Sequence, residues 1–223
     1  MKHFQVLSAL LQYPEQPLLD CLPEIDDALI EASTMRRTLV PLFDYLASTH
    51  LLILQENYVA TFDRNPSHSL HLFEHIHGES RDRGQAMVDL MEEYKKHGLD
   101  MSGDELPDFV PLFLEFLSQV DEDKAAQMLS DAVHVLAHVG RKLKADGSPY
   151  AAVFDVIEQL SPVVAEELSE PPVRDMDEAL ETFGPGADGI EPLLKNQTGG
   201  PQPINFYPRA DRGEKRRSTV VAR

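Results

Sequence analysis

Apolar residues over roughly the first 160 positions recur at intervals of three and four, the spacing that places side chains on one face of an α-helix. No sustained alternation of polar and apolar residues appears, and no Asn-Gly or Asp-Gly turn separates β-branched runs. The pattern predicts an all-α fold, a single bundle of about seven to nine helices. The stripes are Phe4, Leu7, Leu10 and Leu11; Leu39, Phe43 and Leu46; Leu51, Leu54, Tyr58 and Phe62; Met87, Leu90, Met91 and Tyr94; Leu106, Phe109, Val110, Phe113 and Leu117; and Leu129, Ala132, Leu136, Val139 and Leu143.

Turn residues mark two of the expected helix boundaries. Gly147 follows the last of these stripes at a position typical of a helix stop. Ser148 is a suitable N-cap for the next helix, and Pro149 suits its first turn because the missing N–H would have no partner there. We therefore expect one helix to end before Gly147 and another to open at Ser148.

The composition changes beyond Ser161, where Gly, Pro and charged residues replace the apolar stripes. Such a segment has few side chains able to bury surface. The sequence predicts an all-helical domain over residues 1–165. Residues 166–223 are predicted to form a mostly flexible tail, acidic at first and basic at its end, with one possible short helix.

Charge narrows the choice of partner. The chain has 38 acidic and 20 basic residues, a net charge of −18. The last fifteen residues, "RADRGEKRRSTVVAR", contain six basic and two acidic groups, so their net charge is +4 and that of the remainder is −22. An acidic body repels phosphate backbones and attracts cationic partners. We predict no nucleic-acid partner.

The chain lacks the features of an exported or membrane-spanning protein. Its single cysteine, Cys21, excludes an intrachain disulfide. The start "MKHFQVLSALLQYPEQ" has no long apolar region and no small-residue cleavage site. No apolar run approaches the ~20 residues that span a bilayer. We expect a cytoplasmic protein with no direct membrane insertion.

One segment, "HSLHLFEHIHGESRDRGQAM", gathers an unusual density of titratable side chains. On a helix, His68, His71 and His75 would share a narrow face, and the spacing of His71 and His75 could hold a zinc ion. A structural zinc site needs four protein ligands, however, and a catalytic site usually three. Because no His-Glu-x-x-His motif occurs and the cysteine is distant, we predict no metal ligands.

Other interpretations of this segment differ in plausibility. An enzyme lacks support, since there is no Gly-x-Ser-x-Gly elbow and no phosphate-binding Gly-x-x-x-x-Gly-Lys loop. The histidines could simply border a buried face formed by Leu72, Phe73 and Ile76. They could instead border a groove for an amphipathic, cationic peptide, which suits the acidic body. We favour the groove and keep two alternatives: a generic helical peptide-binding adaptor, and a metal-dependent enzyme built on His71, His75, His77 and Glu79.

Longer motifs carry more information than the histidines alone. The block "HLFEHIHGESRDRGQAMVDLMEEYKKHGL" and the following "ELPDFVPLFLEFLSQV" resemble the assembly chaperones of respiratory nitrate reductase, the NarJ type. Those chaperones belong to the all-helical redox-enzyme maturation family typified by TorD and DmsD. The stretch "NYVATFDR" is similar to the family's Tyr-x-x-x-Phe element, and the resemblance covers roughly residues 1–160.

The resemblance implies a chaperone with no catalytic residues and no cofactor of its own. Members of the family bind the N-terminal segment of the nitrate reductase catalytic α subunit and hold it competent for molybdenum-cofactor and iron–sulfur insertion. They also keep the immature αβ complex from docking too early to its membrane subunit. The implied partner is thus the α subunit, with indirect contact to molybdenum-cofactor delivery proteins.

The family's motifs fall on particular positions. The Glu-x-Pro-Asp-His pattern runs from Glu105 to Asp108 and then departs, because Phe109 stands where the family usually has histidine. If that histidine only packs, phenylalanine is a conservative replacement; if it makes a polar contact, this chain lacks the contact. The central block falls on Phe73, Glu74, His75, His77, Gly78, Glu79, Ser80, Arg81, Asp82, Arg83 and Gly84, preceded by the aromatic Tyr58.

These observations together predict a client-binding surface that combines apolar anchors with acidic groups. The residues predicted to bind the client peptide are Tyr58, Phe62, Asp63, His71, Leu72, Glu74, His75, His77, Glu79 and Asp108. The residues predicted to order the following loop or support the structure are Gly78, Arg81, Asp82, Arg83 and Pro107.

The histidines predict a pH response. With an ordinary pKa near ~6.5 they gain charge on acidification and repel a cationic client, so we expect weaker binding at pH 5.5 than at pH 7.5. Calorimetric titration at both pH values measures the difference. Equal affinities at the two pH values would show that the histidines do not affect client binding.

Overall fold

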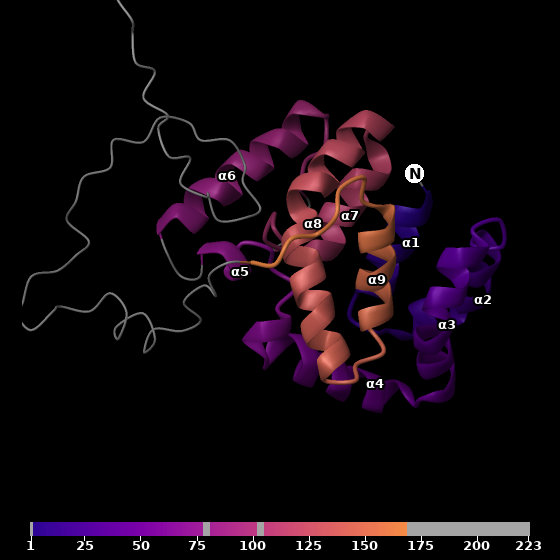
Figure 1. The fold of residues 1–223 in the computed structure, drawn as a ribbon. Coiled ribbons are helices and arrows are strands. Elements are labelled where there is room, and N and C mark those ends of the chain that lie inside the picture. Colours follow the sequence, from indigo (N-terminus) through magenta and orange to yellow (C-terminus); the bar gives the residue numbers. More distant parts are fainter. Residues whose placement is uncertain (1, 78–80, 102–104, 169–223) are drawn as a thin grey trace, which may run out of the picture.

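The computed structural model describes residues 2–77, 81–101 and 105–168, and these ranges contain nine α-helices and no strand beyond an isolated β-bridge. The predicted all-α fold with seven to nine helices is confirmed (Figure 1). The elements are α1 (Lys2–Leu10), α2 (Gln16–Ala28), α3 (Ser33–Ser48), α4 (Leu51–Tyr58), η1 (Val59–Asp63), η2 (Pro66–His68), α5 (Glu74–His77), α6 (Arg81–Lys96), α7 (Val110–Gln119), α8 (Glu122–Ala145) and α9 (Ala151–Leu160).

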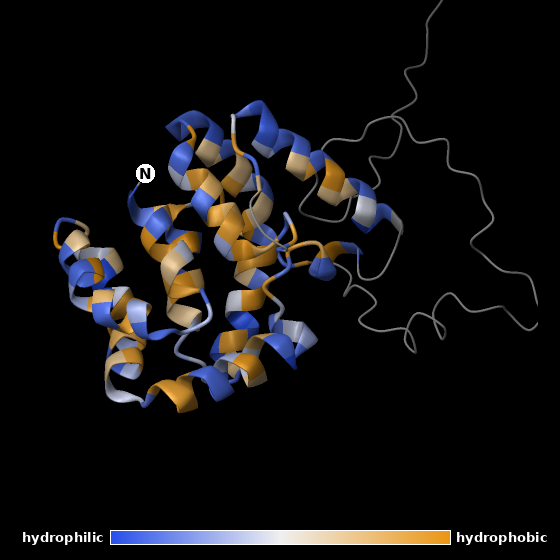
Figure 2. Ribbon diagram, turned by 180° about the vertical axis from the view of Figure 1, so that it is seen from behind, coloured by the Kyte–Doolittle hydropathy of each residue, from blue (hydrophilic) through white to orange (hydrophobic). Residues whose placement is uncertain are grey.

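The long helix α8 forms the centre of the bundle. Its predicted stripe from Leu129 to Leu143 is buried, because α9 packs along it and α7 contacts it. The helices α7 and α9 pack in turn against α1 and α3. Figure 2 shows the apolar segments concentrated where these helices meet, with hydrophilic segments on the outer turns. Even a polar group in this core is paired, since the Ser8 hydroxyl donates to the Pro111 carbonyl at 2.7 Å.

The helices α2 and α3 form an outlying pair at one side of the bundle (Figure 1). Of the two, α2 contacts α1 and α3, whereas α3 packs on α9. An exposed ion pair joins them: the Arg36 guanidinium donates to both carboxylate oxygens of Asp26, at 2.6 and 2.5 Å. In the ranges given above, no helix combines the length and apolar character needed to cross a bilayer.

The end of α4 widens into a π-helical turn, η1. The Arg64 N–H donates to the Val59 carbonyl at 3.0 Å, a five-residue step in place of the usual four. Phe62 remains buried against Tyr58 across this turn, with ring centroids 4.8 Å apart, whereas the next residue, Asp63, is exposed. The turn therefore separates a buried aromatic stripe from a surface carboxylate.

Two predicted boundaries have different outcomes. The helix stop at Gly147 is confirmed, because α8 ends at Ala145 and Gly147 has a φ of 69°, a conformation that favours glycine. The predicted start at Ser148 is wrong, since α9 begins at Ala151. The carbonyl of Ser148 instead accepts from the Ala151 N–H at 3.1 Å and forms a turn that precedes the helix.

A short non-helical strap follows α9. Residues 161–168, the last part of the orange segment in Figure 1, run across α8, where the Glu166 N–H donates to His134 Nδ1 at 2.9 Å. Leu168, the last described residue, packs against the hydrophobic core. The predicted tail lies outside the described residues from position 169 onward.

A glycine at the α8–α9 interface provides a test of this packing. Gly140→Ala should lower the free energy of unfolding by about 1–3 kcal/mol, because the new Cβ would lie 2.6 Å from Phe154 Cβ and overpacking has costs of this size. That cost exceeds the ~1 kcal/mol that alanine gains in helix propensity. Chemical denaturation measures the change.

Gly84→Ala in α6 is the matched control, because nothing lies within 4 Å of its added Cβ. It should leave stability unchanged or raise it by up to ~1 kcal/mol. Equal effects of the two substitutions would contradict the close approach of α8 and α9.

Candidate functional site

The histidine segment is not the single helix that its spacing predicts. Residues 66–77 consist of the 3-10 turn η2, a non-helical stretch over residues 69–73 with His71 in an isolated bridge, and the one-turn helix α5. The non-helical stretch pairs with a segment more than thirty positions further on: the Leu72 N–H donates to the Asp108 carbonyl at 3.0 Å, and the Val110 N–H to the Leu70 carbonyl at 2.8 Å. This non-local pairing overrides the local helical period, so His68, His71 and His75 do not share a face.

The histidines accordingly lie in different environments. His68 is buried with its Nε2 3.0 Å from Asp146 Oδ2, at the C-terminal end of α8. His75 is also buried, and its Nε2 donates to the Ser69 carbonyl at 2.8 Å. Across the part of the chain that is described, no three His, Cys, Asp or Glu side chains converge in a way that could hold a metal ion.

Asp108 is the centre of the polar network between the two paired segments. Its carboxylate is fully buried; Oδ2 accepts from the Phe73 N–H at 3.0 Å, and Oδ1 lies 3.3 Å from His71 Nδ1. Burial alone would lower the pKa of His71, but the hydrogen bond and the negative charge of Asp108 outweigh burial and raise it. The pair therefore favours a protonated His71 whose ring is still partly open to solvent.

A second set of contacts joins α5 to α6. The Ser69 hydroxyl donates to one carboxylate oxygen of Glu74, and Arg83 Nη2 donates to the other at 2.9 Å. This ion pair is the kind of contact that the predicted loop-ordering role of Arg83 requires. Burial and the charge of Arg83 lower the pKa of His77, while the exposed Asp82 opposes them. Gly78 and Glu79 lie outside the described residues, as does the side chain of Arg81.

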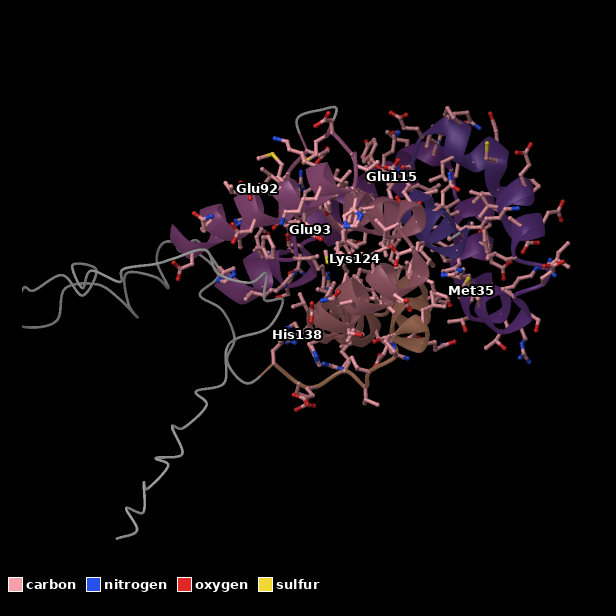
Figure 3. All side chains as sticks on the ribbon, turned by 90° about the horizontal axis from the view of Figure 1, so that it is seen from above. Met35, Glu92, Glu93, Glu115, Lys124 and His138 are labelled. Carbon is pink, nitrogen blue, oxygen red and sulfur yellow. The ribbon has the colours of Figure 1, made fainter. Side chains whose placement is uncertain are left out.

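The C-terminal half of α6 is tied to the rest of the bundle. The Tyr94 hydroxyl donates to the carbonyl of the buried Pro107 at 2.8 Å. Glu93 and Lys124 lie together in Figure 3, and Lys124 Nζ is 2.5 Å from Glu93 Oε1. The hydrogen bond from Lys124 lowers the pKa of Glu93. These contacts hold α6, and with it Arg83, against α8 and the loop that carries Asp108.

Three residues predicted to bind the client belong to the core. Tyr58 and Phe62 are each 5% exposed and Leu72 is 0% exposed. The Tyr58 hydroxyl donates to the Leu11 carbonyl at 2.8 Å, and both aromatic rings pack on Tyr150. Burial raises the pKa of Tyr58 well above its ordinary range. These three side chains are part of the core in this structure, and their predicted contact with a client stays a prediction.

Phe109, which stands where the family usually has histidine, packs against His71. Its ring lies beside that of His71 with centroids 5.5 Å apart and an interplanar angle of 36°, and the two residues form the isolated bridge. Phenylalanine is thus accommodated as a packing residue at this position. The neighbouring Leu106 is 40% exposed and presents an apolar side chain to solvent.

The structure therefore sorts the predicted residues into three groups. His71, Glu74, Arg83 and Asp108 lie in adjoining networks around the paired segments, while His75 and Pro107 support them from the interior. Tyr58, Phe62 and Leu72 are packing residues. Asp63 and Asp82 are exposed.

One surface feature was missed by the sequence interpretation. A groove of about 830 Å³ lies between α2 and α3, and Leu19, Leu22, Phe43 and Leu46 contribute its apolar lining. The stripe of α3 was recognised, whereas α2 was not, because its two prolines and four acidic residues obscure the apolar period. The groove is well separated in sequence from the histidine segment.

Comparison with known proteins identifies relatives over most of the chain. The family model described as "Nitrate reductase delta subunit" matches residues 30–156. The nitrate reductase molybdenum cofactor assembly chaperone NarJ of Escherichia coli K12 is 37% identical over 186 residues, 79% of each chain. NarW of the same organism, named as an assembly chaperone of the same kind, is 42% identical over 164 residues, 72% of this chain and 68% of NarW.

A solved structure is similar in fold. It is that of a redox enzyme maturation protein from Archaeoglobus fulgidus, with a TM-score of 0.55 and 20% sequence identity. The match covers 71% of this chain and 91% of that chain. At this identity the similarity concerns the helical arrangement alone.

The Asp108–His71 pair yields a test of the network. Asp108→Asn should lower the pKa of His71, because the neutral amide removes the charge that opposes burial. NMR titration of the His71 ring measures the shift. Since the pKa of His71 is raised in the folded protein, this pair stabilises most fully below the ordinary value of 6.5 and loses its effect as the pH rises through the raised value.

The stability deficit of Asp108→Asn should accordingly be larger at pH 6 than at pH 9. Glu92→Gln, an exposed change on α6, is the control and should leave the pKa of His71 as it is. An unchanged His71 pKa in Asp108→Asn would show that the carboxylate does not set it.

Proposed function

Because the chain belongs to the nitrate reductase delta subunit family, we propose that it is a cytoplasmic chaperone that binds the N-terminal segment of the nitrate reductase catalytic α subunit. Its relatives are named as molybdenum cofactor assembly chaperones, not as catalysts, and the chain is not an enzyme. In this proposal the bound segment stays competent for molybdenum-cofactor and iron–sulfur insertion. The observation that carries the proposal is the 79% mutual coverage with NarJ.

The polar surface around the paired segments supports a role in orienting a cationic client. Asp108 holds His71, and Ser69 and Arg83 hold Glu74, so that both side chains keep a fixed position while partly open to solvent. Asp63 is exposed nearby in sequence. Each exposed ion pair contributes only ~0–1 kcal/mol, so these groups set orientation and association rate more than affinity. We propose that His77 and Glu79 extend this acidic and imidazole-bearing rim.

Affinity in this proposal comes from apolar anchors of the client. Each well-buried anchor contributes ~1.5–3 kcal/mol, several times the effect of an exposed ion pair. Since Tyr58, Phe62 and Leu72 are buried, the anchors must meet other surface, beginning with the exposed Leu106 beside the polar rim. In this proposal Tyr58 and Phe62 contribute indirectly, because they stabilise the core that supports the polar rim.

The proposed chaperone acts at a defined stage of assembly. It holds the α subunit within the immature αβ complex, delays docking to the membrane subunit, and departs when the cofactors are in place. No cofactor is assigned to the chaperone itself, and any contact with molybdenum-cofactor delivery proteins is indirect.

Calorimetric titration tests the proposal directly. The full chain is titrated with a peptide of about 20–30 residues from the N-terminus of the same organism's nitrate reductase α subunit, at pH 7.5 and two salt concentrations. We expect saturable one-to-one binding that weakens only modestly at high salt, because apolar contacts are little affected by ionic screening.

Glu74→Gln and Glu115→Gln provide the matched comparison. Loss of one rim charge should weaken binding by up to about fivefold, the equivalent of one exposed ion pair, whereas the exposed Glu115 on α7 should have no effect. No binding by the wild-type chain would overturn the choice of client. Equal binding by the wild-type chain and by Glu74→Gln would favour a generic helical adaptor.

A further inference from the structure

The groove between α2 and α3 has the dimensions and lining of a binding surface. Its volume of about 830 Å³ lies in the range of pockets that hold small ligands or several side chains. Ile30 and Val40 line it and are 58% and 44% exposed, respectively, so apolar surface of the groove is open to solvent. Surface of this kind is stabilised when another apolar group covers it.

The charges around the groove indicate which charge its occupant carries. Asp20 and Asp44 line it from opposite helices, and neither has an ion-pair partner among the described residues. Asp26, by contrast, is neutralised by the bidentate contact with Arg36. Arg36 and Arg37 also line the groove, so its three carboxylates and two guanidinium groups leave a net charge of −1. The surrounding residues 15–49 contain seven acidic and two basic side chains, a net charge of −5. A fitting occupant combines apolar anchors with cations that meet Asp20 and Asp44.

We propose that the groove is occupied by the C-terminal segment of this same chain, residues 203–223, "PINFYPRADRGEKRRSTVVAR". The segment begins with the apolar side chains Ile204, Phe206 and Tyr207, and its basic residues follow directly. Its net charge is +4 in a chain whose remainder is −22. The aromatic anchors fill the apolar part of the groove, and the arginines meet Asp20 and Asp44.

The chain is long enough for this contact. The described part ends at Leu168, on the side of the bundle opposite α2 and α3 in Figure 1. The 34 residues from 169 to 202 could span up to about 110 Å when extended. A domain of this size has a radius of gyration of about 15 Å, so the distance around it is well within reach.

Because the segment belongs to the same chain as the groove, even a modest affinity is sufficient to keep the groove occupied. A segment on the same chain has an effective concentration of up to about millimolar at its target, so a micromolar site would be nearly always filled. Opposite charges on groove and segment speed the encounter and select this segment over the acidic parts of the chain. The groove is in this way covered without a second molecule.

The native Cys21 provides a reporter for the full chain. It is the chain's single cysteine, it is exposed, and it lies on α2 between the groove residues Asp20 and Leu22 without lining the groove itself. A nitroxide attached there broadens the NMR signals of nearby amides. We expect the signals of residues 203–223 to lose most of their intensity, and those of residues 185–195 to lose less.

Two double variants test whether the groove causes the broadening. Asp20→Lys with Asp44→Lys should restore the tail signals. Asp89→Lys with Glu92→Lys changes the net charge equally on α6 and should leave the broadening in place; Figure 3 shows Glu92 on the far side of the bundle from Met35 of α3. Circular dichroism verifies that each variant is folded. If the groove variant is unfolded, Phe206→Ser with Tyr207→Ser tests the same contact from the tail.

Other occupants give different results, each of which overturns the proposal. Tail signals that remain sharp in the folded wild-type chain would exclude docking. Broadening seen only when nitroxide-bearing and isotope-labelled chains are mixed would place a second copy's tail in the groove. Client-peptide binding that depends on Asp20 and Asp44, with tail signals sharp throughout, would assign the groove to the client. Failure of the client peptide to bind would affect the proposed function alone.

Discussion

The buried carboxylate of Asp108 is the interaction on which the arrangement of the candidate site depends. A charge without access to water is tolerated only when hydrogen bonds and an opposite charge compensate for its lost hydration. The Phe73 N–H and the His71 ring supply that compensation from positions 35 and 37 residues away in sequence. Neither segment can move alone without leaving the charge uncompensated. The position of the loop that carries Leu106 and Phe109 is therefore coupled to that of the histidine segment.

How much of the fold could be predicted depended on whether a pattern was local. The stripe of α8 repeats over many turns, and every predicted residue from Leu129 to Leu143 is buried. The histidine segment also has a helical period, but the extended pairing of Leu70 and Leu72 with a distant loop replaces it. A spacing rule cannot anticipate such a partner. The start of α9 differed for a smaller reason, because Ser148 and Pro149 form a turn before the helix instead of its cap and first turn.

The candidate site was predicted by residue type more accurately than by exposure. Several motif residues do gather around one junction, but some of them, such as Asp108, are buried in the scaffold, whereas others, such as His71 and Glu74, reach solvent. An aromatic residue in a motif is equally compatible with a core and with a binding surface, and only packing distinguishes them. Tyr58 and Phe62 pack on Tyr150, which follows them by about ninety positions. The groove between α2 and α3 was missed because its walls come from two helices whose relative placement is not a sequence property.

The π turn at Val59–Asp63 has a consequence for how this region can vary. Each residue of an α-helix turns the chain by about 100°, so removing one residue from the turn would rotate everything that follows by that amount. His68, five positions later, would then leave its place beside Asp146 at the end of α8. Substitutions in the turn change single side chains, whereas a deletion changes the direction of the whole connection. Between α4 and the histidine segment, the geometry thus constrains the number of residues as well as their identity.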